Sequence, residues 1–130
     1  MNLALILTAV NGFLVVLLGA FGAHGLENML GPVRLETWNT GVQYHMFHTL
    51  ALFGLGLLCL NYPENALLER CVKLFLTGIV IFSGSLYVLA LTGLSWLGMI
   101  TPLGGLAFLG AWICLLLALI KNKKLNQPHV

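Results

Sequence analysis

Residues 40–60, with the sequence TGVQYHMFHTLALFGLGLLCL, decide the fold of this chain. They contain no charged side chain, and a helix needs roughly 20 mostly apolar residues to cross a hydrocarbon core about 30 Å thick. Three more stretches of this kind lie at residues 3–23, 74–91 and 100–120. Only 8% of the 130 residues are charged, whereas an ordinary soluble domain has about 25%. The sequence therefore predicts a single transmembrane domain, residues 1–130, that crosses the membrane four times.

The four spans are predicted to be helices. Backbone N–H and C=O groups inside lipid need partners within the protein, and a helix supplies them within one segment. Spanning β-strands would alternate apolar and polar residues over about ten positions, whereas the apolar runs here are continuous. No Lys or Arg precedes the first span, as one would in a signal peptide, so we expect this span to be retained. The predicted fold class is all-α, an integral membrane four-helix bundle.

The basic residues predict the orientation of the bundle. Short cytoplasmic loops carry the excess of Lys and Arg in multi-pass membrane proteins. Arg34 is alone on one side of the four predicted spans, and the other side holds Arg70, Lys73, Lys121, Lys123 and Lys124. We therefore predict that both termini are cytoplasmic. This topology accounts for the net charge of +2, and no feature of the sequence indicates nucleic-acid binding.

The connection between the first two spans is amphipathic. Between residues 24 and 39, apolar side chains such as Leu30 are interleaved with Glu27, Arg34 and Glu36. Such a pattern is typical of short helical pieces that lie in the membrane interface. Pro32 should interrupt them, because proline disfavours a continuous helix. We predict an amphipathic interfacial segment between the first and second helices.

The three cysteines do not indicate redox chemistry. Cys59, Cys71 and Cys114 fall in the half of the membrane that is predicted to face the cytoplasm, and none forms a CxxC pair. Disulfides are rare in that reducing compartment. We expect buried free thiols that pack as small apolar groups, and not a thiol oxidoreductase.

Polar residues gather toward the predicted outer end of the spans. Each helical residue turns about 100°, so His48 and His45 lie about 40° and about 100° from Tyr44, on one face. Intramembrane ionisable residues are costly and usually face the bundle interior or a cavity, which favours a functional site. Histidines that only hydrogen-bond a neighbouring helix are the alternative. We predict a polar pocket in the outer leaflet, formed by residues of four helices: His24, Tyr44, His48, Ser83, Tyr87 and Thr101.

Several chemistries fit such a pocket. The first hypothesis is a non-enzymatic binding or transport-associated module for a small or lipidic ligand, because no complete catalytic set is present. A second is a membrane enzyme that acts on a lipid-soluble substrate, with His48 as general base and Tyr44 or Tyr87 as partner. A third is a metal or haem site, since neutral imidazole is a common ligand. We assign no metal and no cofactor.

One absence and one pattern limit the remaining possibilities. No Asp or Glu lies inside a predicted span, so a small exporter with an intramembrane carboxylate lacks its key group. Small residues recur at helical spacing, as in GAFGAHG at residues 19–25, and they allow close helix packing in lipid. We expect a compact bundle, with membrane lipids and further copies of the chain as partners.

Four motifs together resemble one family. They are GAFGAHGL, TGVQYHMFHTLAL after a Trp, FSGSLYVLAL and LGMITPLGGLAFLGAW, and they run from about Gly12 to Trp112. In order and spacing they resemble the domain-of-unknown-function 423 family of small bacterial membrane proteins, to which the eukaryotic transmembrane protein 256 is related. The resemblance implies a four-span, multi-pass protein of the bacterial inner (cytoplasmic) membrane, and it implies no activity.

The resemblance also sorts the polar residues. Most of the family pattern is present, namely His24, Trp38, Tyr44, His48, Ser83, Ser85, Tyr87, Thr101, Pro102, Gly104, Gly105 and Trp112. His45 departs from it, because the family commonly has Gln there. The pattern then requires a hydrogen-bonding residue at this position, and imidazole is one way to supply it. On this interpretation His45 is the replaceable neighbour of His48, and a three-histidine metal site loses support.

Overall fold

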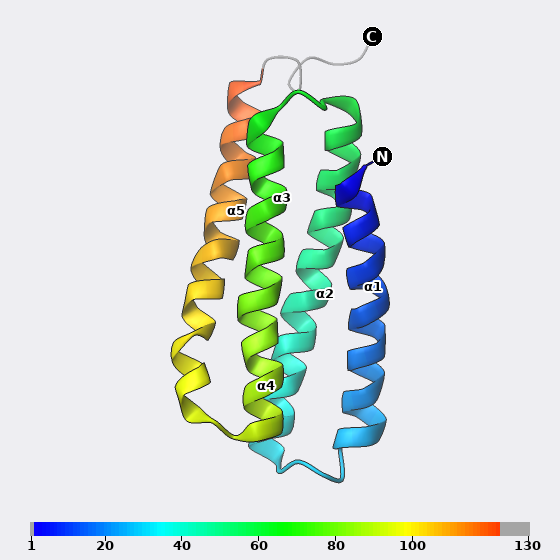
Figure 1. Cartoon of the computed structure of the whole chain (residues 1–130), viewed down its shortest axis with the longest axis vertical. Helices are drawn as coiled ribbons and strands as arrows, with labels where there is room; N and C mark the ends of the chain where they lie inside the picture. The colour runs from blue at the N-terminus through cyan, green and yellow to red at the C-terminus, as the bar shows by residue number, and fades with distance from the viewer. Residues whose placement is uncertain (1, 123–130) are drawn as a thin grey trace.

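The computed structural model describes residues 2–122, and every regular element in this part is helical. Four long helical segments lie side by side along the long axis (Figure 1). The first two are α1 (Leu3–Phe21) with the π-helical turn η1 (Gly22–Leu26), and α2 (Pro32–Asn61). The third joins α3 (Ala66–Gly78), the π-helical turn η2 (Ile79–Ser83) and α4 (Gly84–Thr92), and the fourth joins the 3₁₀ turn η3 (Ser95–Met99) to α5 (Thr101–Lys121). All four segments are long and apolar enough to span a membrane, which confirms the four predicted spans.

Two helix starts differ from the prediction: the third span begins at Ala66 and not at residue 74, and α2 begins before residue 40. This helix begins at Pro32, where a proline at the first position loses no hydrogen bond. The predicted interfacial segment is therefore divided: its first residues end the first helix as η1, and its last residues form two turns of α2. With 30 residues, α2 is about 45 Å long. As a result His48 lies near the middle of α2 and not near its outer end.

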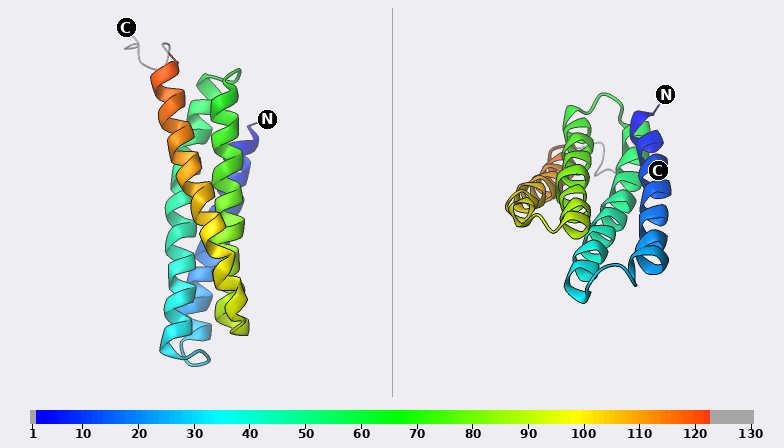
Figure 2. Two further views of the ribbon diagram at one scale, coloured as in Figure 1. Left: turned by 90° about the vertical axis from the view of Figure 1, so that its left-hand side faces the viewer. Right: turned by 60° about the horizontal axis from the view of Figure 1, so that its bottom comes forward.

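Each long helix packs mainly on its neighbours in sequence. α1 packs along α2, α2 packs along α3, η2 and α4, and α3 and η2 pack along α5. The tilted view shows α1 at one edge and α5 at the other (Figure 2, right). The α2–α3 connection, the start of α1 and the end of α5 lie at one end of the bundle, which we name the inner end after the predicted orientation; the opposite end is the outer end (Figure 1).

Glycines allow close helix contacts, as at Gly104 and Gly22. A Cβ on Gly104 of α5 would overlap the backbone nitrogen of Phe82 in η2. A Cβ on Gly22 would lie 2.5 Å from Nε1 of the Trp38 indole. Small residues let backbones approach in lipid, where apolar attraction between helices is absent. These contacts hold α5 against η2 and the end of the first helix against α2.

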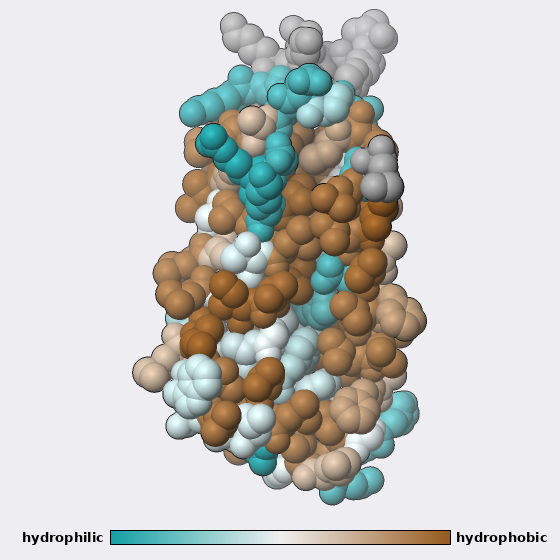
Figure 3. Space-filling view, viewed as in Figure 1, coloured by the Kyte–Doolittle hydropathy of each residue, from teal (hydrophilic) through white to brown (hydrophobic). Residues whose placement is uncertain are grey.

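The distribution of side chains is that of a membrane protein. Large apolar residues such as Phe13, Val16 and Leu106 are exposed, while His45, His48 and three hydroxyl residues are buried. The visible face is largely hydrophobic, with hydrophilic residues gathered mainly near the two ends (Figure 3). Within residues 2–122, no buried side-chain nitrogen or oxygen lacks a hydrogen-bond partner. The buried polar groups are therefore paired across or within helices, as a lipid environment requires.

Candidate functional site

His48 lies at the floor of the strongest candidate site. Its side chain is 4% exposed. Nδ1 lies 2.8 Å from the carbonyl oxygen of Tyr44 one turn earlier, and because a carbonyl only accepts, Nδ1 carries the proton. Nε2 is then an acceptor, and the indole N–H of Trp112 donates to it over 3.4 Å. Both ring nitrogens are thus used by a neutral imidazole.

Aromatic rings enclose the imidazole. Phe108 of α5 stacks on it, with ring centroids 3.5 Å apart and an angle of 6° between the planes. Phe47 meets it edge-on at 5.1 Å, and Phe75 lies at 5.8 Å. The α3 residue Phe75 packs edge-on against Trp112 at 5.1 Å, which fixes the indole that bonds His48. The hydrogen bonds and the stacking together hold His48 in one rotamer.

A lateral groove, which we call the aromatic groove, opens beside this cluster. It has a volume of about 770 Å³. Tyr44 and Trp112 form part of its exposed wall, with 43% and 39% of their surface accessible. A Cβ on Gly105 would lie 3.9 Å from the Phe82 ring, so the absence of a side chain there keeps the groove open. The full lining comes from α2, η2 and α5: Gln43, Tyr44, Phe47, His48, Phe82, Pro102, Gly105, Leu106, Phe108, Leu109 and Trp112.

A second polar cluster joins three helices on the other side of α2. His45 is 3% exposed; its Nε2 lies 3.0 Å from Oδ1 of Asn11 in α1, and its Nδ1 lies 3.0 Å from the hydroxyl of Tyr87 in α4. The Asn11 amide nitrogen donates to the carbonyl of Leu7, so Oδ1 is the acceptor for Nε2–H. Nδ1 therefore accepts from the Tyr87 hydroxyl. His45 is the hydrogen-bonding centre of α1, α2 and α4.

The predicted pocket residues are divided between separate environments. Tyr44 and His48 line the aromatic groove, whereas Tyr87 bonds His45. Ser83 donates to the Gly41 carbonyl over 2.8 Å, and so ties η2 to α2. The structure thus brings Tyr44 and His48 together, and it places Tyr87 and Ser83 on the side of α2 that faces the third helix.

Two other predicted residues do not line the groove. Thr101 bonds the hydroxyl of Ser85 at 2.6 Å and donates to the Leu97 carbonyl over 3.2 Å. His24 is exposed in η1. In the part of the chain that the structure describes, no hydrogen bond or ring contact joins His24 to His48.

Sequence reasoning missed three residues of the two clusters. Helical spacing does not identify Phe108 and Trp112 as neighbours of His48, although they follow Gly104 on α5 at intervals of four residues. Asn11 was not recognised at all. An isolated amide within an otherwise apolar span is a signal that could have identified it, because lipid disfavours an unpaired polar group. His45 was interpreted as the replaceable partner of His48, but in the structure it belongs to a different cluster.

Within residues 2–122, no group of three or more His, Cys, Asp or Glu side chains is arranged to hold a metal ion. The three cysteines are free thiols, and Cys71 is fully buried. Cys114 of α5 donates to the Leu67 carbonyl of α3 at 3.4 Å, which is a structural contact between these helices.

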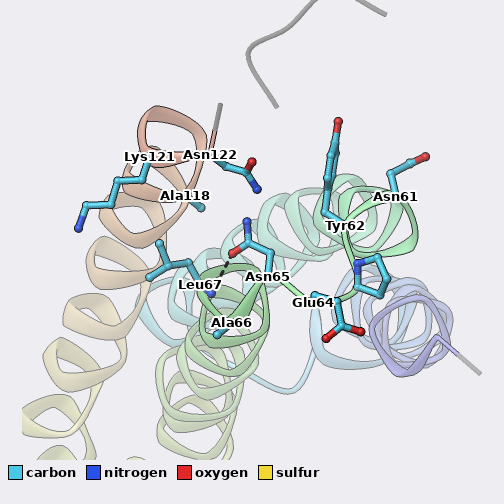
Figure 4. Close-up of a pocket in the computed structure, with 10 residues that line it drawn as sticks. Asn61, Tyr62, Glu64, Asn65, Ala66, Leu67, Ala118, Lys121 and Asn122 are labelled. Carbon is cyan, nitrogen blue, oxygen red and sulfur yellow. Dashed lines mark hydrogen bonds between the residues drawn. The ribbon is translucent and has the colours of Figure 1, made fainter. Parts of the chain in front are cut away.

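A cavity of about 750 Å³ at the inner end has a different character. It lies between the end of α2, the start of α3 and the end of α5 (Figure 4). The Asn65 side chain accepts from the backbone N–H of Leu67 at 3.0 Å and caps α3. The amine of Lys121 points away from the other side chains drawn (Figure 4). We assign these polar groups to the stabilisation of the helix ends. The aromatic groove remains the better candidate site.

Comparisons with known proteins agree with the architecture. A family model described as "Protein of unknown function (DUF423)" matches residues 18–105. The chain is 48% identical over 121 residues to the UPF0382 membrane protein YwdK of Bacillus subtilis (strain 168), which covers 93% of this chain and 98% of that protein. It is 42% identical over 125 residues to the UPF0382 inner membrane protein YgdD of Escherichia coli (strain K12), covering 96% and 95%. No solved structure matches the chain significantly.

Proposed function

We propose a ligand-binding function for this chain, which belongs to the DUF423 family of proteins of unknown function. It is a multi-pass membrane protein with four spans. In our proposal the aromatic groove binds a lipid-soluble small molecule that carries a planar, polar head group. The observation that carries the proposal is a buried His48, which donates to the Tyr44 carbonyl, at the floor of a groove in the side of the helical bundle.

The groove wall supports a ligand with a flat ring. Ligand sites are concave and mostly apolar, with a few polar groups that fix orientation. Here Tyr44, Phe82 and Trp112 offer ring faces and edges, and aromatic pairs prefer offset or edge-on packing. A planar head group could stack between such walls, while an apolar tail extends along the lipid-facing side of α5.

The hydrogen bond between Trp112 and His48 supports a polar contact with the ligand. Its length is 3.4 Å, whereas N–H donors in proteins usually lie about 2.7–3.2 Å from their acceptors. A carbonyl or hydroxyl oxygen in the groove could accept from the Trp112 indole at a better distance. Gln43 and the Tyr44 hydroxyl are further groups at the exposed rim.

The groove gives less support to a catalytic use of His48. In the described residues, His48 hydrogen-bonds neither the Tyr44 hydroxyl nor Tyr87, and its Nδ1 is committed as a donor to a carbonyl. Only Nε2 could act as a base, and this would require Trp112 to leave it. The membrane enzyme remains the second candidate function. A transport-associated role for the protein with its ligand bound is a further proposal. Assembly into homo-oligomers is another.

Two glycine variants test the proposal. The full chain would be extracted from membranes in a mild detergent, and retained small molecules would be identified by native mass spectrometry. Gly105→Leu should fill the groove and remove a stoichiometric ligand. Gly54→Leu is the matched control, because a Cβ on Gly54 of α2 meets nothing within 4 Å. A groove that is empty in the unmodified protein, or a ligand that survives Gly105→Leu, would overturn the proposal.

A further inference from the structure

A second groove lies between α1 and α3, at the inner end. The Asn2 side chain donates to the Gly56 carbonyl over 3.0 Å and fixes where α1 begins. Gly56 is about 7 Å before the end of α2 at 1.5 Å per residue, so α1 begins below the connection between α2 and α3 (Figure 1). α1 packs along α2 and leaves a groove of about 550 Å³ between itself and α3. We call it the inner groove.

The inner groove changes from polar to apolar along its length. Its depth is lined by aliphatic residues of α1 and α3, among them Leu7, Val72 and Leu76. Its mouth carries Glu69 and Lys73, whose charged groups lie 2.8 Å apart and whose side chains are 69% and 71% exposed. A hydrophilic strip runs down α3 from the inner end and stops at apolar surface (Figure 3).

The apolar length of the groove fits within one membrane leaflet. From Glu69 to Leu76 the helix advances about 10 Å, and half of a hydrocarbon core is about 15 Å. The charged mouth therefore lies at the depth of the lipid head groups when the aliphatic part lies among the acyl chains. An amphipathic molecule in this groove would meet charge at its head and carbon along its tail.

We propose that the inner groove binds one phospholipid with a zwitterionic ethanolamine head group, from the leaflet at the inner end. The ammonium group of this lipid faces Glu69 and its phosphate faces Lys73. One acyl chain lies between α1 and α3, against Leu7 and Leu76. This site is separate from the aromatic groove, so either can fail without the other.

Charge complementarity favours a lipid over a second copy of the chain. A protein partner in the groove would have to cover the Glu69–Lys73 pair, and removing paired charges from water is costly. A head group leaves the pair hydrated at the membrane surface and adds one opposite charge to each member. An anionic head group would satisfy Lys73 but would be repelled by Glu69.

The experiment uses the full chain and defined lipids. Protein in detergent is mixed with vesicles of phosphatidylethanolamine, phosphatidylglycerol and phosphatidylcholine in equal amounts, and retained lipids are counted by native mass spectrometry. We expect one retained phosphatidylethanolamine. Phosphatidylcholine should be retained less, because its ammonium has no N–H to donate to Glu69.

Three matched variants locate the site. Lys73→Gln should reduce retained phosphatidylethanolamine by about fivefold, the upper range for an exposed ion pair. Glu69→Gln should lower the preference for phosphatidylethanolamine over phosphatidylglycerol by a similar factor. Arg70→Gln is the control, because Arg70 neighbours the pair on α3 but does not line the groove. Helix content, measured by circular dichroism, checks that each variant folds.

Several outcomes would overturn the proposal. One is equal retention of the three lipids, and another is a loss of lipid in the Arg70→Gln variant as large as that in Lys73→Gln. A third is a dimer that cross-links between the cysteines of Leu3→Cys and Leu76→Cys. The last result would assign the inner groove to a second copy of the chain. Leu3→Trp supplies a further test that leaves the charges unchanged, since Leu3 is an exposed lining residue and a larger side chain there should displace the acyl chain.

Discussion

Removing the Tyr87 hydroxyl should destabilise the protein, and a second tyrosine offers a matched control. Tyr87→Phe deletes the donor to Nδ1 of His45 and leaves that nitrogen without a partner in a side chain that is 3% exposed. An unsatisfied buried polar atom costs about 1–3 kcal/mol. Measured hydrogen bonds between transmembrane helices average about 0.6 kcal/mol, with a maximum near 1.7. We therefore expect a loss of about 1 kcal/mol in the free energy of unfolding.

The control is Tyr44→Phe, which removes the same hydroxyl from a ring that is 43% exposed. No hydrogen bond in the described part of the chain uses that hydroxyl, so Tyr44→Phe should change stability by much less. The assay is reversible unfolding in mixed micelles of SDS and a mild detergent, followed by circular dichroism. If Tyr87→Phe costs no more than Tyr44→Phe, His45 does not hold α4 to α2, and the assignment of His45 as the hydrogen-bonding centre is wrong.

Three other predictions concern the contacts between helices and the orientation. Gly104→Ala should cost about 1–3 kcal/mol by overpacking, because a Cβ there overlaps the Phe82 backbone, while Gly54→Ala should not; the same unfolding assay compares them. Arg34→Gln should cost about 1 kcal/mol, because the guanidinium donates to the Ala90 carbonyl at the end of α4 over 2.6 Å; an unchanged midpoint would contradict this. Finally, a tag on either terminus should be accessible to a protease only from the cytoplasmic side, and access from outside would reverse the predicted orientation.

The number of spans could be predicted from the sequence, but the start of α2 could not. Hydropathy alone identifies the four apolar runs, because the bilayer sets their length. Residues 32–39 contain charges and a proline, which locally resemble an interfacial segment. Tertiary contacts decide otherwise. Trp38 donates to the Leu18 carbonyl at 3.0 Å, and Arg34 reaches the end of α4, so both residues are held as part of one long helix.

The site could be predicted only in part, because depth is easier to infer than helix rotation. Helical spacing correctly places Tyr44 and His48 on one side of α2. Depth alone assigned Tyr87 to His48, but Tyr87 is turned toward His45, and the ring that stacks on His48 belongs to Phe108. Which face of α4 and α5 meets α2 depends on close approaches such as that of Gly104 to Phe82, and these are not visible in one sequence.

The packing of each helix on its neighbours in sequence bears on how the protein is made. α1 and α2 form one antiparallel hairpin, and the third and fourth long helices form another, joined by the short connection between Asn61 and Ala66. The contacts between α1 and α2 can therefore form in the membrane before the ribosome has synthesised the second hairpin, whereas the contacts of α2 with α3, η2 and α4 form later. His45, with its bonds to Asn11 and Tyr87, then joins the finished halves. The two hairpins, produced as separate polypeptides in one cell, should find each other and rebuild the whole.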